Sequence, residues 1–318
     1  MRIREHKKYT VISLFAGCGG SSLGYRMADF EELLAVEWDK DAAETFKMNF
    51  PEVPIYIGDI AKLSGKECME LAGISSGELS VLDGSPPCQG FSMIGKRKID
   101  DPRNVLFAEF VRLLKALHPK VFVMENVTGL IQGHMKKYYL EIIETLRSCG
   151  YQVKGEILNA QYFNVPQKRR RVILIGVRND LDTIPSHPRP QTKPTGPKKD
   201  SECEARVLTE KENYSVRRHK AKNIIKKSAF GYHEITEREP VNTVIKTHIL
   251  TNSFFWPEGN NLRMPSETEL KRMGSFPDDF KFTNYKKAWE RIGNSVPPML
   301  MKAIAEHIKK EILDKVVV

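Results

Sequence analysis

The sequence predicts an α/β protein in which helices cover both faces of a mainly parallel sheet. Short apolar runs typical of buried strands recur at 11–15, 33–37, 81–83, 121–124 and 172–177. The segments between several of these runs carry apolar residues at helical spacing. Regular alternation of strand and helix indicates a parallel sheet, because each parallel connection crosses over one face of the sheet. At 318 residues the chain is long enough for two domains.

Four helices are expected from particular signals. Asp39 can cap the amino end of a helix that runs toward Phe50. The ranges 104–117 and 136–148 place apolar residues three and four positions apart. Near the carboxyl end, the apolar residues of 300–312 form a single stripe, and Pro298 suits a first helical turn.

Composition excludes several classes of protein. No apolar run approaches the roughly 18 residues of a membrane span. The start MRIREHKK lacks the apolar stretch of a signal peptide, so a cytoplasmic protein is expected. Five scattered cysteines do not make a disulfide framework, and without a Cys-x-x-Cys pair no metal site is expected. The net charge of +10 fits a nucleic-acid partner, with a merely basic surface as the alternative.

Most of the excess charge lies in one stretch. Between 186 and 233, twelve Lys and Arg stand against five Asp and Glu, which accounts for +7 of the total. Five prolines between 185 and 197 stiffen the start of this stretch and exclude helix there. The pattern predicts a linker followed by a basic module, and a solvated surface loop is the alternative.

Candidate ligand-binding groups follow the first predicted strands. In open parallel sheets, ligands bind outside the carboxyl ends of the strands. Three glycines within 17–20 allow a tight turn and close approach of the backbone to a ligand, although a plain turn is the alternative. Further on, Glu37 is placed to hold a ribose diol, Trp38 to stack on adenine, and Asp59 to accept from an adenine amino group. Since these loops contain no Lys or Arg, they favour S-adenosylmethionine (AdoMet) over a dinucleotide.

Cys88 is a candidate nucleophile. It follows the predicted strand at 81–83 inside the sequence GSPPCQGFS at 84–92. Two prolines directly before it fix its approach, and glycines on both sides leave space around it. A cysteine at a strand end in a tight polar loop is placed for nucleophilic attack, whereas a lone Cys is more often a small buried apolar residue.

Five motifs together resemble the DNA (cytosine-5) methyltransferases of bacterial restriction–modification systems. They are SPPCQGFS at 85–92 (the nucleophile motif), FAGCGG at 15–20 (the cofactor loop), ENV at 125–127, QKRRR at 167–171 (Gln-x-Arg-x-Arg) and GNSV at 293–296 (the closing cofactor motif). They occur in family order and span nearly the whole chain. The resemblance implies a Rossmann-like AdoMet-dependent methyltransferase fold with a second, smaller target-recognition domain.

The resemblance implies a catalytic set of Cys88, Glu125, Arg171 and Arg169. Cys88 adds as a thiolate to carbon 6 of cytosine, which enables carbon 5 to attack the sulfonium methyl. Glu125, if protonated, donates to N3 of the base and accepts from its 4-amino group. Arg171 holds O2 of the base and orients Glu125, while Arg169 is expected to be structural or to bind a backbone phosphate. The target base must be flipped out, because this chemistry cannot occur inside a stacked duplex.

By motif, the resemblance also assigns binding residues. The cofactor contacts are Phe15, Gly17, Gly19, Gly20, Glu37, Trp38, Asp59, Ile60, Pro87, Asn294 and Val296. The DNA contacts are Ser92, Met93, Ile94, Lys96, Arg97 and Lys98 in the loop that closes over DNA, and Gln167, Arg217, Arg218, Lys220, Lys222 and Thr243 elsewhere. The basic stretch falls where the family keeps its recognition region, in which base edges give specificity.

The match is weaker inside the recognition region. PVNTV at 240–244 resembles the family's Pro-x-x-Thr-Val element. RMPSETE at 263–269 matches the family's Arg-x-Leu-Thr-Pro-Arg-Glu only at Arg263, Glu269 and, by type, Ser266. Ser266 and Glu269 also form a capping-box pattern, which predicts the start of a helix.

The closing motif returns the chain to the first domain. A discontinuous catalytic domain is therefore expected at 1–180 plus 283–318, and a recognition domain at 181–282.

The expected partners are AdoMet, double-stranded DNA and a cognate restriction endonuclease, with a monomeric chain and no membrane or metal partner. One alternative is a transfer RNA cytosine-5 methyltransferase, although its characteristic Cys-Phe-Thr element is absent from the sequence. Another is a catalytically silent DNA-binding relative, against which the intact catalytic motifs argue.

Overall fold

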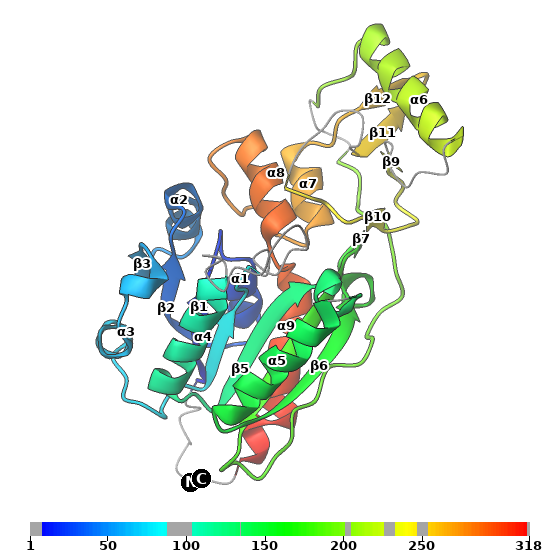
Figure 1. The fold of residues 1–318 in the computed structure, drawn as a ribbon. Coiled ribbons are helices and arrows are strands. Elements are labelled where there is room, and N and C mark those ends of the chain that lie inside the picture. The colour runs from blue at the N-terminus through cyan, green and yellow to red at the C-terminus, as the bar shows by residue number, and fades with distance from the viewer. Residues whose placement is uncertain are drawn as a thin grey trace, which may run out of the picture. The chain divides into compact units, whose positions relative to one another are not determined.

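The structure, a computed structural model, describes residues 8–87, 104–133, 135–200, 205–225, 233–246 and 254–316 (Figure 1). The side chains at 104, 105 and 218–225 lie outside that description. The chain divides into two compact units. Unit 1 comprises 1–158, 170–189 and 301–318, and unit 2 comprises 159–169 and 190–300.

A seven-stranded sheet forms the centre of unit 1. Its strand order is β3-β2-β1-β4-β5-β8-β6. The strands are β1 (Thr10–Leu14), β2 (Glu31–Glu37), β3 (Ile55–Ile57), β4 (Val81–Gly84), β5 (Val121–Val127), β6 (Tyr151–Asn159) and β8 (Arg170–Arg178). Strands β1 to β5 are parallel to their neighbours among themselves, and β8 runs antiparallel to β5. The prediction of a mainly parallel sheet is confirmed.

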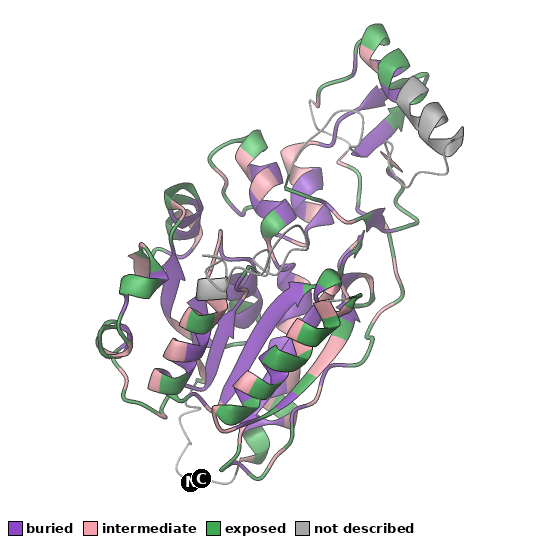
Figure 2. Ribbon diagram, in the orientation of Figure 1, coloured by how far each residue is buried: buried purple, intermediate pink, exposed green. Residues whose placement is uncertain are grey.

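Helices cover both faces of this sheet. They are α1 (Gly20–Met27), α2 (Lys40–Asn49), α3 (Gly65–Ala72), α4 (Asn104–Leu117), α5 (Met135–Ser148) and α9 (Pro298–Glu311). In Figure 1, α4 and α5 lie in front of the sheet, and α1 and α9 lie behind it. Fully enclosed side chains of α4, such as Phe110 and Leu113, pack with Phe122 of β5 in one large apolar core. Figure 2 shows the central strands as mostly buried, whereas the edge strand β6 is partly exposed.

Local signals place several helices as predicted. The Asp39 carboxylate accepts from the backbone N–H groups of Asp41 and Ala42 and so caps α2. Helix α4 has the predicted bounds, and α5 begins one residue earlier than predicted. Pro298 is the first residue of α9. Short 3-10 turns complete the described regular structure, at η1 (Ile60–Lys62), η3 (Thr128–Ile131), η4 (Ala160–Tyr162) and η6 (Leu313–Lys315).

The described part of unit 2 contains short strands and three α-helices. Its elements are β7 (Gln167–Lys168), α6 (Glu210–Ile225), β9 (His233–Glu234), β10 (Val241–Asn242), β11 (Phe254–Glu258), β12 (Asn261–Arg263), α7 (Glu267–Met273) and α8 (Tyr285–Asn294). Strand β7 pairs with β10, and β11 lies between β12 and β9. A small core joins Val216 of α6 to Phe255 and Leu262 of the strands. The described residues 184–200 contain no helix or strand, as their prolines predict.

The division into units differs from the predicted boundaries at three places. Residues 181–189 group with unit 1, whereas the sequence placed them in the recognition domain. Residues 159–169 and 283–300 group with unit 2, whereas the sequence placed them in the first domain. The reason is local bonding, because Arg169 donates to the carbonyl oxygens of Val244 and Gly293, both at 3.0 Å. Gln167 likewise donates to the carbonyl of Met273 at 3.1 Å.

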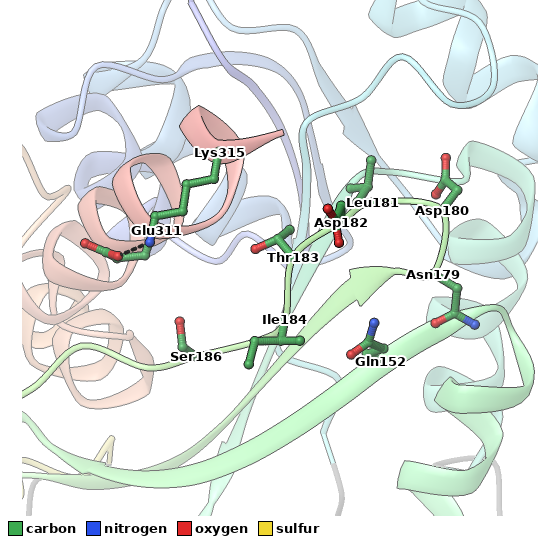
Figure 3. Close-up of a pocket in the computed structure, with 10 residues that line it drawn as sticks. All are labelled: Gln152, Asn179, Asp180, Leu181, Asp182, Thr183, Ile184, Ser186, Glu311 and Lys315. Atoms are coloured by element: carbon green, nitrogen blue, oxygen red, sulfur yellow. Dashed lines mark hydrogen bonds and ion pairs between the residues drawn. The ribbon is translucent and has the colours of Figure 1, made fainter. Parts of the chain in front are cut away.

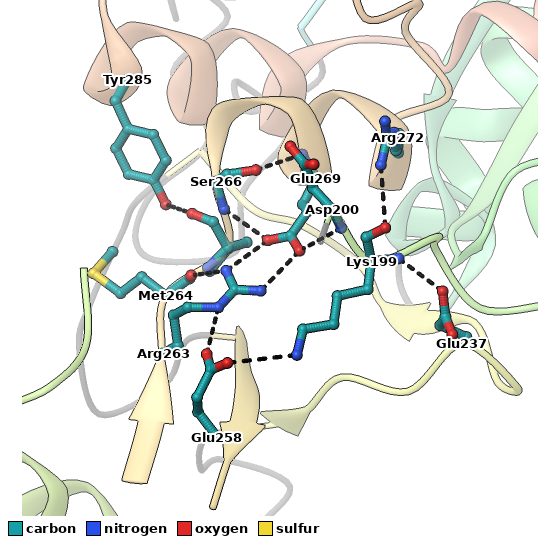
Figure 4. A network of polar contacts seen from close by, with 11 residues as sticks. Lys199, Asp200, Glu237, Glu258, Arg263, Met264, Ser266, Glu269, Arg272 and Tyr285 are labelled. Carbon is teal, nitrogen blue, oxygen red and sulfur yellow. Dashed lines mark hydrogen bonds and ion pairs between the residues drawn. The ribbon is translucent and has the colours of Figure 1, made fainter. Parts of the chain in front are cut away.

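A buried ion pair organises the start of α7 (Figure 4). Arg263 donates from Nη1 and Nη2 to the two carboxylate oxygens of Glu269, both at 2.9 Å, and from Nε to Glu258 at 2.8 Å. Ser266 and Glu269 form the predicted capping box. Burial raises the pKa of Glu269, but hydrogen bonds from Arg263 and from backbone N–H groups outweigh it, so the net shift is downward. The three positions of the 263–269 segment that match the family pattern therefore belong to one hydrogen-bonded network.

Candidate active site

The predicted site residues of unit 1 gather at one edge of the sheet. Because β1 to β5 run in the same direction, their carboxyl ends meet there. The glycine loop follows β1, Trp38 follows β2, Asp59 follows β3, and Pro86 and Pro87 follow β4. Glu125 lies near the end of β5.

The glycine loop has a backbone that most residues avoid. Phe15, Gly17 and Gly19 all have positive φ, at 58°, 58° and 93°. A Cβ on Gly19 would overlap the ring of Phe50, so only glycine fits there. A Cβ on Gly17 would meet no atom within 4 Å, which leaves open space beside the loop. Gly20 is the first residue of α1. A strained, open turn at a sheet edge is typical of a ligand-binding loop.

Glu37 fixes the glycine loop through hydrogen bonds, in addition to its predicted role in ligand binding. Its Oε2 accepts from the backbone N–H of Gly17 at 2.7 Å. Its Oε1 accepts from the N–H groups of Trp38 and Asp39 at 2.9 and 2.8 Å. The sequence assigned Glu37 to ligand binding but gave no signal for this second role. A carboxylate has about four acceptor positions, so one remains for a ligand hydroxyl.

Trp38 and Asp59 border the same edge. The Trp38 residue is 78% exposed, which is unusual for so large an apolar side chain unless a ligand or partner covers it. Asp59 is exposed and caps η1 by accepting from Ala61 N–H at 3.0 Å, while Ile60 is buried. Arg112 of α4 holds this turn, since its Nη2 donates to the carbonyls of Ile60 and Leu63 at 2.9 and 2.8 Å. The sequence gave no sign of the role of Arg112.

Asn126 fixes the approach to the nucleophile motif. Its Nδ2 donates to the carbonyl of Pro86 at 3.0 Å, and its Oδ1 accepts from Val127 N–H at 2.9 Å. Pro86 is buried and Pro87 is exposed. Asn126 was quoted within the Glu-Asn-Val motif but was not predicted as a site residue, so membership of the motif was the signal that could have found it.

Glu125 and Arg171 form a partly enclosed ion pair. The Arg171 Nε lies 2.7 Å from Glu125 Oε1, and the two side chains are 13% and 11% exposed. Strands β5 and β8 are antiparallel with Val127 opposite Arg171, so the arginine reaches diagonally to Glu125. Arg171 also donates from Nη1 to the carbonyl of Arg170 at 2.9 Å. Toward the residues that the structure describes, these contacts use Glu125 Oε1 and the Nε and Nη1 atoms of Arg171.

Three predicted contacts have internal partners in unit 2. Arg169 is 2% exposed and donates to two backbone carbonyls, so of its two expected roles the structural one fits and a phosphate contact does not. Gln167 is 1% exposed, and its Oε1 accepts from Val244 N–H at 3.1 Å. The prediction that Gln167 contacts DNA does not fit this enclosed position. Thr243 donates to the carbonyl of Lys168 at 2.9 Å.

Other predicted residues lie in unit 2 or outside the description. Asn294 is exposed at the end of α8, and Val296 is buried. Arg217 is exposed on α6 and donates to the carbonyl of Asn260 at 3.3 Å. Arg218, Lys220 and Lys222 lie on α6, with side chains outside the description. Outside the described residues lie Cys88, Ser92, Met93, Ile94, Lys96, Arg97 and Lys98.

A cavity of about 730 Å³ lies elsewhere in unit 1 (Figure 3). Its lining includes Asp180 and Asp182 after β8, and Glu311 and Lys315 at the carboxyl end. The end of β8 pairs with the first residues of β5, so this cavity lies at the edge opposite the predicted site. Within the described ranges, no helix is long and apolar enough to cross a membrane, and no group of three candidate metal ligands occurs.

The fold is that of the Rossmann-like AdoMet-dependent methyltransferases. A family model described as C-5 cytosine-specific DNA methylase matches residues 9–310, and the chain belongs to that family. The protein is a DNA (cytosine-5) methyltransferase.

Curated relatives agree with this family, and solved structures agree with the fold. The type II methyltransferase M1.HphI of Haemophilus parahaemolyticus is 37% identical, with 95% of this chain and 87% of that protein covered. M.XorII of Xanthomonas oryzae pv. oryzae is 32% identical, with 96% and 85% covered. The structure of Spodoptera frugiperda DNMT2 has a TM-score of 0.73 at 20% identity, with 95% and 99% covered. A putative DNA modification methyltransferase of an E. coli prophage has a TM-score of 0.68 at 23% identity, with 96% and 100% covered.

Proposed function

We propose that this protein transfers a methyl group from AdoMet to carbon 5 of a flipped-out cytosine in a specific double-stranded DNA site, through a covalent bond between Cys88 and carbon 6. The observation that carries the proposal is the Glu125–Arg171 pair, at 2.7 Å, in which Glu125 lies on β5, the strand next to the one that leads into the Cys88 motif. Such a pair suits a planar ring that needs both a hydrogen-bond donor and an acceptor along one side.

The residues at the sheet edge fit AdoMet. Glu37 has acceptor capacity left for ribose hydroxyls, exposed Trp38 offers a face to adenine, and Asp59 can accept from the adenine amino group. The open side of Gly17 leaves room for the rest of the ligand. When bound, AdoMet supplies an electrophilic methyl group. Phe15, Gly19, Gly20, Ile60, Pro87, Asn294 and Val296 complete the proposed contacts.

The catalytic steps follow from the proposed roles. The Cys88 thiolate adds to carbon 6, and the electron density that enters the ring is stabilised at N3 by a proton on Glu125. Arg171 holds O2 of the base and keeps Glu125 oriented. Asn126 fixes the Pro86 carbonyl and so sets the direction in which the chain enters the Cys88 loop. Carbon 5 then takes the methyl group, loses its proton to a base or water, and the thiol is eliminated.

DNA recognition is proposed for unit 2, and methyl transfer for unit 1. Unit 2 holds most of the basic stretch, including Arg217 on α6. The loop at 92–98 is proposed to close over the DNA. Since the relatives are named type II methyltransferases, we also propose a cognate restriction endonuclease and a cytoplasmic site of action on DNA.

Replacing the nucleophile tests the proposal. Cys88→Ser is expected to abolish methyl transfer to DNA, because a hydroxyl does not reach the anionic form at neutral pH. Wild-type-like turnover by this variant would contradict the covalent route.

DNA that contains 5-fluorocytosine should form a stable adduct in the presence of AdoMet, since the fluorine cannot leave as a proton does. Intact mass that never shifts would exclude the adduct, and bisulfite sequencing of DNA from expressing cells would reveal the target site.

A further inference from the structure

A buried polar cluster lies on the α1 face of the sheet, and the proposed reaction does not use it. Its two acids are Asp83, on β4 one residue before Gly84, and Glu32 on β2. Ser13 of β1 and Tyr25 of α1 complete it, and both are fully enclosed, while Asp83 is 3% exposed. Part of Glu32 reaches the surface, but its Oε2 is enclosed.

A β-bulge brings Glu32 into this cluster. In the pairing of β1 with β2, Glu32 lies opposite Val11, but Leu34 lies opposite the next residue, Ile12, so Leu33 is an extra residue. Side chains alternate along a strand, so without the bulge Glu32 would share the face of Leu34 and point into the large apolar core. The bulge turns Glu32 to the face of Val11, which is the face of the cluster.

Hydroxyl groups donate hydrogen bonds to both acids, but little positive charge lies near them. Ser22 donates to Glu32 Oε1 at 2.8 Å, and Tyr25 donates to Asp83 Oδ1 at 3.4 Å. The Ser13 hydroxyl lies close enough to the Glu32 carboxyl to lower its pKa, but without the geometry of a hydrogen bond. In the described part of the chain, the charged groups that act on the pair are Arg26 and Glu52 toward Glu32, and Glu125 toward Asp83.

This environment favours protonated carboxyls. Burial raises the pKa of Glu32 to about 7. Burial, and then repulsion from Glu32, raise the pKa of Asp83 to about 8. Arg26 is itself paired with Glu52, which limits its help to Glu32. At neutral pH at least one of the two acids therefore stays protonated, and no cation needs to enter the cluster.

We propose that Glu32 and Asp83 are positioning residues that together retain at least one proton and, through their hydrogen bonds with Ser22 and Tyr25, hold α1 against β2 and β4. The inference rests on the proposed function, since α1 begins directly after the glycine loop that we assign to AdoMet. When the pair releases its proton to solvent, two enclosed negative charges repel each other and loosen α1 from the sheet. The glycine loop then loses its fixed shape, and AdoMet binds more weakly.

The test compares the protein with a Glu32→Gln/Asp83→Asn double variant, which keeps both positions neutral at every pH. Since the folded protein binds more protons than the unfolded chain between about pH 4 and pH 8, its stability should fall as pH rises through that window. The melting temperature of the double variant should change less over the same window. The dissociation constant of AdoMet should rise severalfold between about pH 6 and pH 9 for the protein but stay constant for the double variant. Glu31→Gln, which changes an exposed acid one residue away, should behave as the unchanged protein does.

Parallel pH profiles for the protein and the double variant would overturn the proposal. If the double variant does not fold, infrared spectroscopy of the unchanged protein decides instead. A protonated-carboxyl band at neutral pH that disappears by about pH 9 supports the retained proton, and its absence at neutral pH excludes it. Both the melting and infrared measurements are independent of methyl transfer. A protein that shows these profiles but methylates no DNA would contradict the proposed function alone.

Discussion

At the scale of single residues, the site is held by charged and polar groups that each satisfy backbone partners. Glu37 accepts hydrogen bonds from three backbone N–H groups. The Asn126 side chain is hydrogen-bonded to the backbone of both Pro86 and Val127. Such bonds fix side chains within the narrow limits that catalysis requires. Glu37 was predicted as a site residue and Asn126 was not, and the distances show that both hold the backbone of the loops beside the site.

Replacing Arg171 should lower the rate of catalysis, whereas replacing a matched arginine elsewhere on the same strand should lower only stability. Arg171→Ala should lower kcat by roughly 100-fold, because Glu125 loses the cation that orients it. The matched control is Arg178→Ala, on the same strand, where the arginine pairs with Asp180 and donates to the carbonyl of His118. That change should lower the free energy of unfolding by about 1–3 kcal/mol and leave kcat unchanged. Single-turnover rates and thermal melts of both variants check this, and equal kcat losses would contradict the role of Arg171.

At the scale of elements, strand and helix positions were predictable, but the sources of fine positioning were not. The five apolar runs became β1, β2, β4, β5 and β8, and the caps at Asp39 and Ser266 were predicted correctly. The short strand β3 and helix α6 carry no strong apolar period, so sequence patterns did not indicate them. The bulge at Leu33 depends on pairing between strands, which no local pattern encodes. The backbone carbonyls that Gln167 and Arg169 bond are far away in the sequence, so no local pattern predicts these contacts.

Helix α4 should control AdoMet affinity through Arg112. Its guanidinium holds η1, and with it Asp59, by bonds to two carbonyls and to Glu109. Arg112→Gln should raise the KM for AdoMet by roughly 10-fold and change kcat little at saturating AdoMet, because only the binding turn is loosened. Arg147→Gln on α5, where the arginine makes one long bond to Val153, is the control and should leave KM unchanged. A fall in kcat without a change in KM would argue against this role.

At the scale of the whole molecule, most of the basic stretch lies in unit 2, whereas the glycine loop and the Glu125–Arg171 pair lie in unit 1. The sequence located +7 of the net charge in one stretch, and the structure assigns most of that stretch to unit 2. Part of it is paired internally, as in Arg206 with Glu212 and Lys199 with Glu258, so formal charge overstates what is left for DNA. The exposed Arg217 and the basic residues that follow it on α6 are the positions at which we propose DNA binding.

Neutralising α6 should therefore weaken DNA binding without affecting AdoMet. A variant with Arg217, Arg218, Lys220 and Lys222 changed to Gln should bind DNA more weakly. The slope of log affinity against log salt should become shallower by about 0.9 for each DNA phosphate that the variant no longer neutralises. Its dissociation constant for AdoMet should match that of the unchanged protein, because the glycine loop, Glu37 and Asp59 lie in unit 1. The control changes four exposed lysines of unit 1, namely Lys66, Lys115, Lys154 and Lys310, and removes the same net charge. An equal change of slope in both variants would mean that only total charge matters, whereas a change confined to the α6 variant places phosphate binding on that helix.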